Sequence, residues 1–317
     1  MTRRLRSARH FVGLASIGTA AVTFSSVAMG PIPAPGPPGG GSPFGDVLGN
    51  RNLAPSDGAR LVQMDLLSTD GSITPGESTL LGVRMRIQPE WHVYWRNPGE
   101  SGTAPRIEVK GPEGLTTAPI RWPRPVVFQS PWDTTYGYAG EVVLLIPVTV
   151  PAGTPTGPLR LQVAAEWLVC KEACLLGEGQ GSVELTVLAA DAEAPVRTPR
   201  IEPAIAEAMS RIPASWKSLQ GAVARVIQDA DSPRLVLEGP TGGAEKIQFL
   251  PDLTPGVTAG SGLPVNAIIK DGQFRIDVPL EIEPSNAQGR PLEAAGLVTF
   301  GPKATDRSVS IRRPISN

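Results

Sequence analysis

The sequence predicts an all-β protein made of two β-sandwich domains joined by a short helical linker. Glycine and proline contribute 35 and 34 of the 317 residues, which disfavours long helices and favours short strands joined by turns. Hydrophobic residues at 41% are enough to fill cores, and a chain of this length predicts about two domains. Alternating apolar and polar segments also recur at the spacing expected of a sandwich.

The first 28 residues are expected to be a cleaved signal peptide. Four arginines precede an apolar, uncharged run from Phe11 to Ala28, which ends in small residues. The Pro/Gly-rich stretch 29–53 is expected to be a flexible spacer. No later stretch is apolar enough to span a bilayer, so we expect an exported protein without stable membrane insertion, by an export route that the sequence leaves open.

The first β domain is predicted over residues 54–190. Its clearest strand places Leu81, Val83, Met85 and Ile87 on one face and the intervening residues toward solvent. Further strands are predicted by the same alternation or by β-branched runs bounded by turn residues, at 62–66, 107–109, 142–150, 159–167 and 183–187.

A linker with a short helix is predicted over residues 191–217, where Ile205, Met209 and Ile212 share one helical face. A second, smaller β domain is predicted over 218–317. Its expected strands lie at 223–227, 235–237, 247–250, 274–282, 297–300 and 309–311.

The charge balance excludes one class of partner. Charged residues make up 19% of the chain and the formal net charge is -1. Such a balance gives no electrostatic reason to bind nucleic acid or an anionic membrane surface.

Cys170 and Cys174 are the only two cysteines, and in an exported protein they are expected to form a disulfide. A structural staple is one interpretation. However, closing a loop of about five residues removes little unfolded-state entropy, worth about 2 kcal/mol before strain is subtracted. The pair directly follows a predicted strand, and accessible disulfides in tight loops are typical of exchanging pairs. Spacing alone leaves both interpretations open and favours redox exchange.

Three motifs resemble the DsbD/ScsB family N-terminal domain, especially its ScsB-like branch. They are Trp-Leu-Val-Cys-Lys-Glu-Ala-Cys at 167–174, Trp-His-Val-Tyr-Trp-Arg-Asn-Pro-Gly-Glu-Ser-Gly at 91–102, and Tyr-Gly-Tyr at 136–138 followed by the strand at 142–150. The motifs occur in the family's order and span about 54–190. The region 201–317 more loosely resembles the second periplasmic β domain of ScsB-like proteins.

The resemblance implies immunoglobulin-like sandwiches, a periplasmic location and a thiol-disulfide interchange activity of the protein-disulfide reductase type. The domain would take electrons from a thioredoxin-like or membrane reductase and pass them to oxidised periplasmic proteins, without a cofactor. Cys174 would bond to partners, and Cys170 would be its resolving mate. The sequence leaves the direction of electron flow and the role of the second domain open.

The resemblance also implies a loop that covers the disulfide, here Pro131 to Gly137. Thr135 stands where the reductase branch has an aromatic, so Trp132 or Tyr136 is the expected cover, with Asp133 beside them. Packing is the alternative role for each aromatic. His92 and Tyr94 are expected to support the site. His92 with the two cysteines offers soft ligands for copper(I), but we predict no metal site.

The sequence differs from the family pattern in two features, which limit the activity we expect. Leu175-Leu176 replaces the family's usual Ile-Pro, and no transmembrane electron-transfer domain follows the second sandwich, so a separate reductase is expected to supply electrons. The alternative from another class is a non-catalytic periplasmic binding module with a structural disulfide, acting in copper or metal-stress tolerance. The reduction potential of the disulfide separates the two.

Overall fold

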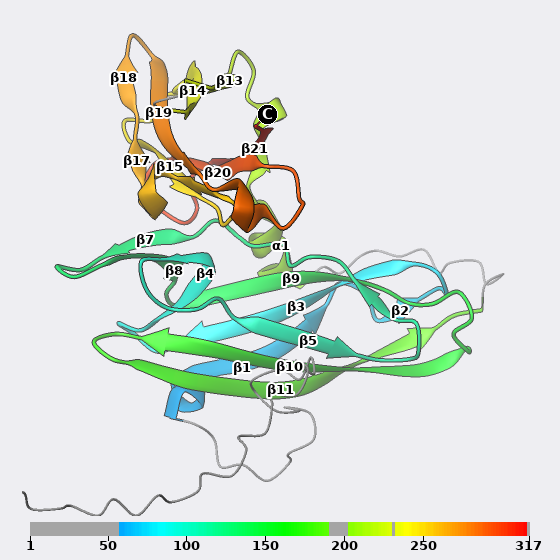
Figure 1. The fold of residues 1–317 in the computed structure, drawn as a ribbon. Helices are drawn as coiled ribbons and strands as arrows, with labels where there is room; N and C mark the ends of the chain where they lie inside the picture. The colour runs from blue at the N-terminus through cyan, green and yellow to red at the C-terminus, as the bar shows by residue number, and fades with distance from the viewer. Residues whose placement is uncertain (1–56, 190–201, 230–231, 316–317) are drawn as a thin grey trace, which may run out of the picture. The chain divides into compact units, whose positions relative to one another are not determined.

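The computed structural model describes residues 57–189, 202–229 and 232–315. The predicted signal peptide, the predicted spacer and residues 191–201 of the predicted linker lie outside these ranges. The described strands form four sheets in two sandwiches, and α1 (Pro203–Ser210) is the one α-helix of the described residues (Figure 1). The predicted all-β class is therefore confirmed.

The first sandwich pairs a four-stranded with a seven-stranded sheet. The four-stranded sheet has the order β1 (Val62–Ser68), β3 (Ser78–Ile87), β9 (Glu141–Thr149), β6 (Thr116–Thr117). The seven-stranded sheet has the order β2 (Ser72–Ile73), β11 (Cys174–Val187), β10 (Gly157–Cys170), β4 (His92–Gly99), β8 (Thr134–Tyr138), β7 (Val126–Gln129), with β5 (Arg106–Lys110) also on β10.

The second sandwich has two five-stranded sheets. One has the order β12 (Ala214–Ser215), β21 (Ser308–Pro314), β20 (Glu293–Phe300), β15 (Ile247–Pro251), β17 (Val265–Asn266). The other has the order β13 (Val223–Ile227), β14 (Arg234–Pro240), β19 (Gln273–Ile282), β16 (Val257–Ala259), with β18 (Ile268–Lys270) also on β19.

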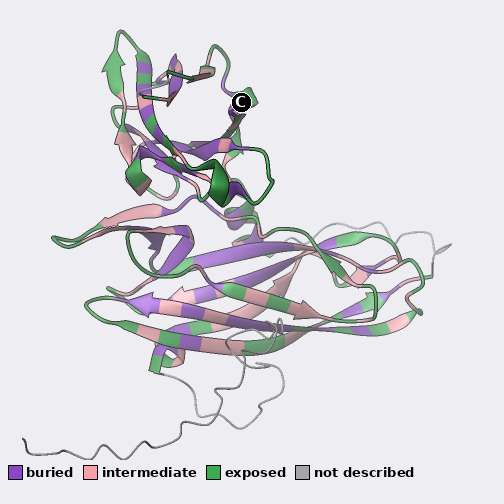
Figure 2. Cartoon of the chain, viewed as in Figure 1, coloured by how far each residue is buried: buried purple, intermediate pink, exposed green. Residues whose placement is uncertain are grey.

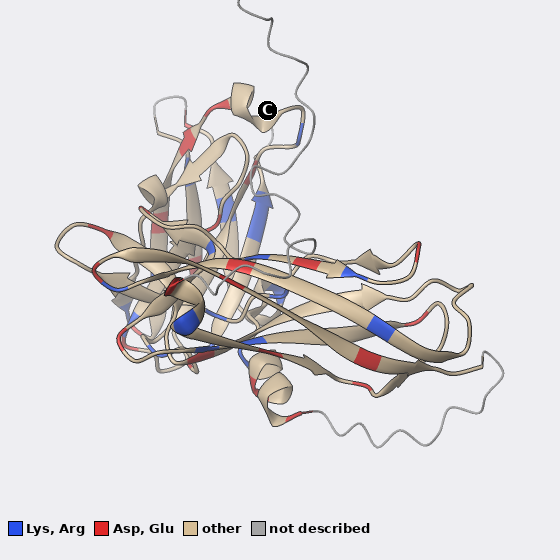
Figure 3. Ribbon diagram, turned by 90° about the horizontal axis from the view of Figure 1, so that it is seen from below, with Lys and Arg blue, Asp and Glu red and all other residues tan. Residues whose placement is uncertain are grey.

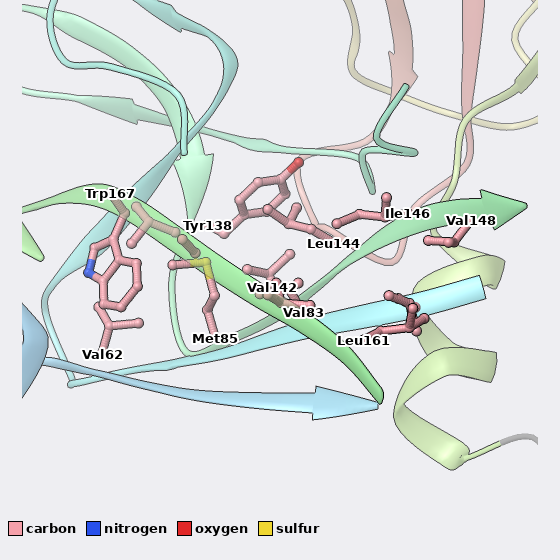
Figure 4. Close-up of a cluster of buried hydrophobic side chains, with 14 of the residues drawn as sticks. Val62, Val83, Met85, Tyr138, Val142, Leu144, Ile146, Val148, Leu161 and Trp167 are labelled. Atoms are coloured by element: carbon pink, nitrogen blue, oxygen red, sulfur yellow. The ribbon is translucent and has the colours of Figure 1, made fainter. Parts of the chain in front are cut away.

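The first core lies between the two sheets of the first sandwich. Figure 4 shows part of it, with Val83 and Met85 of β3, Val142 and Leu144 of β9 and Trp167 of β10 in one cluster. The alternation predicted for β3 places its four apolar side chains in this core, as expected.

Residues 142–146 of β9 are buried on both faces of the strand, and this part of the strand is purple in Figure 2. One face supplies the main core, while Val143 and Leu145 on the other face pack against Ile205 and Ala208 of α1. Burying a side chain such as Ile205 contributes about 1.5–3 kcal/mol. The helix therefore covers a sheet as well as linking two sandwiches. Met209, expected on its buried face, is exposed, and Ala208 takes that place.

All described residues belong to one compact unit, and polar side chains of the first sandwich bond to the second. Asn97 is buried and donates to the Pro251 carbonyl at 2.8 Å, while Arg96 makes a two-pronged ion pair with Asp252, each N–O distance 2.9 Å. The guanidinium of buried Arg124 donates to the carbonyls of Gly301, Lys303 and Asp306. The contacts of Arg96 and Asn97 join β4 to the second sandwich, and those of Arg124 join the segment before β7 to it.

Charged side chains of both signs are spread over the strands and loops of both sandwiches (Figure 3). Within the described residues, no helix combines the length and hydropathy needed to cross a bilayer.

Candidate active site

The two cysteines close the end of a long β-hairpin. Strands β10 and β11 pair in antiparallel register up to Cys170 and Cys174, which face each other with Cα atoms 4.2 Å apart and form a disulfide. Lys171 to Ala173 make the turn, where the Lys171 N–H donates to the Ala173 carbonyl at 3.2 Å. The hairpin ladder already joins these segments, so the disulfide brings together no distant parts of the chain.

The two cysteines differ in solvent exposure because Cys170 lies on an inner strand of the sheet and Cys174 on its neighbour nearer the edge. Cys170 is 3% exposed, since its strand is flanked by β11 on one side and by His92 of β4 on the other. Cys174 is exposed, because β2 pairs with β11 only at the far end, opposite Thr186. Among the described residues, no strand pairs with β11 beside the disulfide, and Cys174 is the more accessible of the two sulfurs.

Tyr94 lies against the disulfide on the face of the sheet turned away from the core. Its neighbours Val93 and Trp95 point into the core, so alternation along β4 directs Tyr94 to the opposite face. Its hydroxyl is 3.5 Å from the Cys174 sulfur, within the range of a weak hydrogen bond. Burial raises the pKa of Tyr94, so the phenol keeps its proton and can donate it.

A loop after β4 covers Tyr94, which is only 1% exposed. Gly102 lies flat against the ring, since a Cβ at this position would be 2.2 Å from ring carbons. The neighbouring Ser101 donates to Asp133 at 2.5 Å, and the Thr134 N–H donates to Glu100 at 2.7 Å. The loop at 100–102 and the turn before β8 are thus tied together over the site.

Asp133 accepts hydrogen bonds on both carboxylate oxygens. Oδ2 accepts from Ser101, and Oδ1 accepts from Ser130 at 2.6 Å. These bonds favour the charged form and lower the pKa of Asp133. Asp133 is therefore a fixed negative charge that orients Ser101.

His92 completes the aromatic surroundings of Tyr94. Its ring stacks on Phe128 of β7, with centroids 4.4 Å apart, and meets the Tyr94 ring edge-on at 5.2 Å. Burial lowers the pKa of His92, and Asp133 acts in the opposite direction. The Nε2 atom is buried without a hydrogen-bond partner. A neutral imidazole fits this apolar setting and supports the Tyr94 ring by packing.

The two aromatics expected to cover the disulfide lie in opposite environments. Tyr136 is fully buried in the first core, edge-on to Trp95, and its hydroxyl donates to the Gly262 carbonyl at 2.9 Å. Trp132 lies at the β7–β8 turn and is 91% exposed. Their roles as cover stay predictions. Ser101, Gly102 and Phe128 were not singled out, although the first two lie in the motif at 91–102.

Lys171, next to the disulfide, forms an ion pair with Glu90. Its Nζ lies 2.9 Å from an oxygen of Glu90, and this hydrogen bond raises the pKa of Lys171. Glu90 therefore offsets the attraction that Lys171 alone would offer a thiolate. Within the described ranges, no group of three His, Cys, Asp or Glu residues is placed to hold a metal ion.

Comparisons with known proteins agree with this arrangement. Residues 63–184 match the family described as thiol:disulfide interchange protein DsbD, N-terminal. The N-terminal periplasmic domain of ScsB from Proteus mirabilis superposes with a TM-score of 0.55 at 19% identity, covering 82% of this chain and 95% of that one. At this identity the match shows a shared fold.

Two other solved structures resemble the chain more weakly. A protein of unknown function from Porphyromonas gingivalis W83 has a TM-score of 0.23 at 12% identity and covers 80% of this chain and 99% of that one. The sporulation control protein Spo0M from Bacillus subtilis has a TM-score of 0.21 at 11% identity, with 80% and 90% covered. A comparison with curated proteins gave no significant match.

Proposed function

We propose that the chain is a periplasmic thiol-disulfide relay, on the premise that residues 63–184, which match the DsbD N-terminal family of thiol:disulfide interchange proteins, share its activity. It takes electrons from a thioredoxin-like or membrane reductase and passes them to oxidised periplasmic proteins. The observation that carries the proposal is the asymmetry of the disulfide. An exposed Cys174, beside the Tyr94 hydroxyl, is bonded to a buried Cys170.

The disulfide is reduced in two exchange steps. A thiolate of the reductase attacks the Cys174 sulfur, the Cys170–Cys174 bond breaks, and Cys170 leaves as a thiolate that takes up a proton. The second thiolate of the reductase then attacks the reductase sulfur of the mixed disulfide. Cys174 leaves as a thiolate and accepts a hydrogen bond from Tyr94, while the reductase becomes a disulfide.

Delivery to the substrate reverses these roles. The Cys174 thiolate attacks a disulfide of the oxidised protein, and the first substrate sulfur leaves as a thiolate. Cys170 then attacks Cys174 in the mixed disulfide and expels the second substrate sulfur. Two electrons and two protons pass to the substrate, and the Cys170–Cys174 bond is restored. A hydrogen bond to a charged group is worth about 1.5–3 kcal/mol, so Tyr94 is well placed to favour Cys174 as the departing thiolate.

A redox titration tests the proposal. Periplasmic and cytosolic exchange proteins have potentials between about −120 and −270 mV, whereas structural disulfides lie below about −300 mV. We expect the Cys170–Cys174 pair in the first range. A potential in the second range would favour a binding module with a structural disulfide and overturn the relay.

Trapping identifies the exchanging sulfur. Cys170→Ser leaves Cys174 without its resolving partner, so we expect mixed disulfides with periplasmic proteins that dithiothreitol releases. Cys174→Ser is the matched control, because its remaining thiol is the buried one. Equal capture by both variants would contradict the assignment of Cys174.

A further inference from the structure

Trp132 has more of its side chain in solvent than any other large hydrophobic residue of the described chain. Its exposed fraction is 91%, and the others with a large exposed fraction are aliphatic or methionine. Single exposed hydrophobic residues are common on protein surfaces. A tryptophan, however, carries 150–250 Å² of surface, roughly, that would gain from burial. Burial of Trp132 against a binding partner would therefore be favourable.

The turn that carries Trp132 is fixed by hydrogen bonds. The Ser130 hydroxyl accepts from the backbone N–H of Trp132 at 3.1 Å and from that of Asp133 at 3.0 Å, and donates to the Asp133 carboxylate. The Ser130 N–H donates to the Asp133 carbonyl at 2.9 Å. The backbone under the indole is thus held in one conformation, which reduces the entropy lost when the side chain is bound.

The same turn is joined to the surroundings of the reactive sulfur. Asp133, next to Trp132, holds Ser101, Gly102 lies against the Tyr94 ring, and the Tyr94 hydroxyl reaches Cys174. Leu176 follows Cys174 by two positions on β11, so both side chains point to the same face of the sheet, and Leu176 is 51% exposed. One exposed apolar residue therefore lies two positions from Cys174, and another lies on the turn whose Asp133 bonds to the loop over Tyr94.

We propose that Trp132 is the anchor on which the exchange partner docks, the partner being a thioredoxin-fold protein with an apolar groove beside its reactive cysteine. The inference rests on the proposed relay and deepens it. A partner bonded to Cys174 must cover the surface around that sulfur. A typical partner covers about 800 Å², a disc of roughly 16 Å radius, and tryptophans dominate the binding energy of such interfaces.

A protein partner is favoured over a membrane surface. The carboxylates of Asp133 and Glu100 lie at the base of the Trp132 turn. Anionic lipids would be repelled by these charges. We therefore expect no insertion of the Trp132 indole into an anionic bilayer, and the experiment below includes vesicles to check this.

The test compares a protein thiol with a small thiol. Stopped-flow kinetics would follow reduction of the oxidised chain by purified thioredoxin and, separately, by dithiothreitol, for the wild type, Trp132→Ala and Trp132→Phe. Leu253→Ala is the matched control, because Leu253 is 64% exposed and lies in the second sandwich. We expect Trp132→Ala to slow the thioredoxin reaction at least tenfold and the dithiothreitol reaction less than twofold, with partial rescue by phenylalanine and no effect of the control.

Each other result has a distinct meaning. A thioredoxin rate for Trp132→Ala within twofold of the wild type, or an equal loss with both thiols, would overturn the anchor and leave the relay standing. Binding of the wild type, but not of Trp132→Ala, to phosphatidylethanolamine–phosphatidylglycerol vesicles would assign the indole to a membrane instead. A wild-type chain that exchanges with dithiothreitol but never with thioredoxin would refute the relay together with the anchor.

Discussion

Replacing Gly102 by alanine is expected to disturb the site through a single methyl group. The added Cβ would lie 2.2 Å from Cε1 and Cζ of the Tyr94 ring and 2.6 Å from Cε2. Carbon atoms in contact normally stay about 3.5–4.0 Å apart. The Tyr94 ring is buried, so it has no free space in which to retreat, and a shift of its ring takes the hydroxyl away from Cys174.

The magnitude follows from two costs. Gly102 has a φ of 92°, and a non-glycine residue held there costs of order 1–3 kcal/mol. Overpacking adds about 1–3 kcal/mol. We therefore expect Gly102→Ala to lower the free energy of unfolding by about 3 kcal/mol or more. Gly140→Ala is the matched control, because its φ is 70° but nothing lies within 4 Å of the added Cβ, so only the backbone cost remains.

Urea unfolding of the oxidised proteins measures both variants, and a double-mutant cycle isolates the contact. In a Tyr94→Ala background the ring is gone, so Gly102→Ala should cost no more than Gly140→Ala does. Equal losses of stability for Gly102→Ala and Gly140→Ala in the wild-type background would show that the Tyr94 ring does not crowd the added Cβ. A loss for Gly102→Ala that persists unchanged without Tyr94 would show the same.

Two further predictions concern buried polar groups. Burial lowers the pKa of His92 below its ordinary 6.5, so its contribution to stability is present above that value and is lost as the pH falls through the folded-state pKa. His92→Phe keeps an aromatic ring for the stack on Phe128 and should reduce the change of the urea midpoint as the pH falls below 6.5. An unchanged pH dependence would assign it to other groups. Arg124→Met leaves three carbonyls without their donor and should lower the free energy of unfolding by about 3 kcal/mol. Arg121→Met is the control, because Arg121 is exposed, and it should change the free energy of unfolding by less than about 0.5 kcal/mol. Similar losses for the two variants would contradict the role of Arg124.

Hydrophobic alternation predicted the strands that bury one face. It missed the first part of β11, which is rich in glycine, and β4, which is buried on both faces. Strand β11 was expected only from residue 183, yet it begins at Cys174. Its first eight residues include Gly177, Gly179 and Gly181, which have no side chains to show an alternation. The Trp167 ring explains one of them, since its Nε1 would lie 2.2 Å from a Cβ on Gly177. The partner strand thus supplies the volume that β11 lacks.

Strand β4 was recognised as a motif and not as a strand, for a related physical reason. Residues on both of its faces are buried: Val93 and Trp95 in the core, Tyr94 under the loop that follows. Asn97 is buried too, because it bonds to the second sandwich. A strand covered on both sides shows no period of two, so its polar residues resemble a loop.

The sequence predicted the site residues that lie in a recognisable motif. It did not predict those that reach the site only through the pairing of strands. Tyr94 and His92 come from the motif at 91–102, their rings are in contact, and Asp133 acts on the pKa of both; their supporting role stays a prediction. Phe128, which stacks on His92, comes from a strand without any motif, and only the pairing of β7 with β8 brings it there. Trp132 and Tyr136 are four residues apart, and their opposite exposures follow from a turn at one and a central strand at the other.

The sheet order also supports the roles proposed for the two sulfurs, with Cys174 as the exchanging and Cys170 as the resolving sulfur. A thiolate attacks a disulfide along the axis of the S–S bond, opposite the leaving sulfur. The Cys170–Cys174 bond joins β10 to β11, so the far side of Cys170 faces β4, where His92 is its register partner. The far side of Cys174 faces the edge of β11, where no described strand pairs with it. This arrangement favours in-line approach of a protein nucleophile to Cys174 over Cys170, and the hairpin keeps Cys170 beside Cys174, as the proposed resolving step requires.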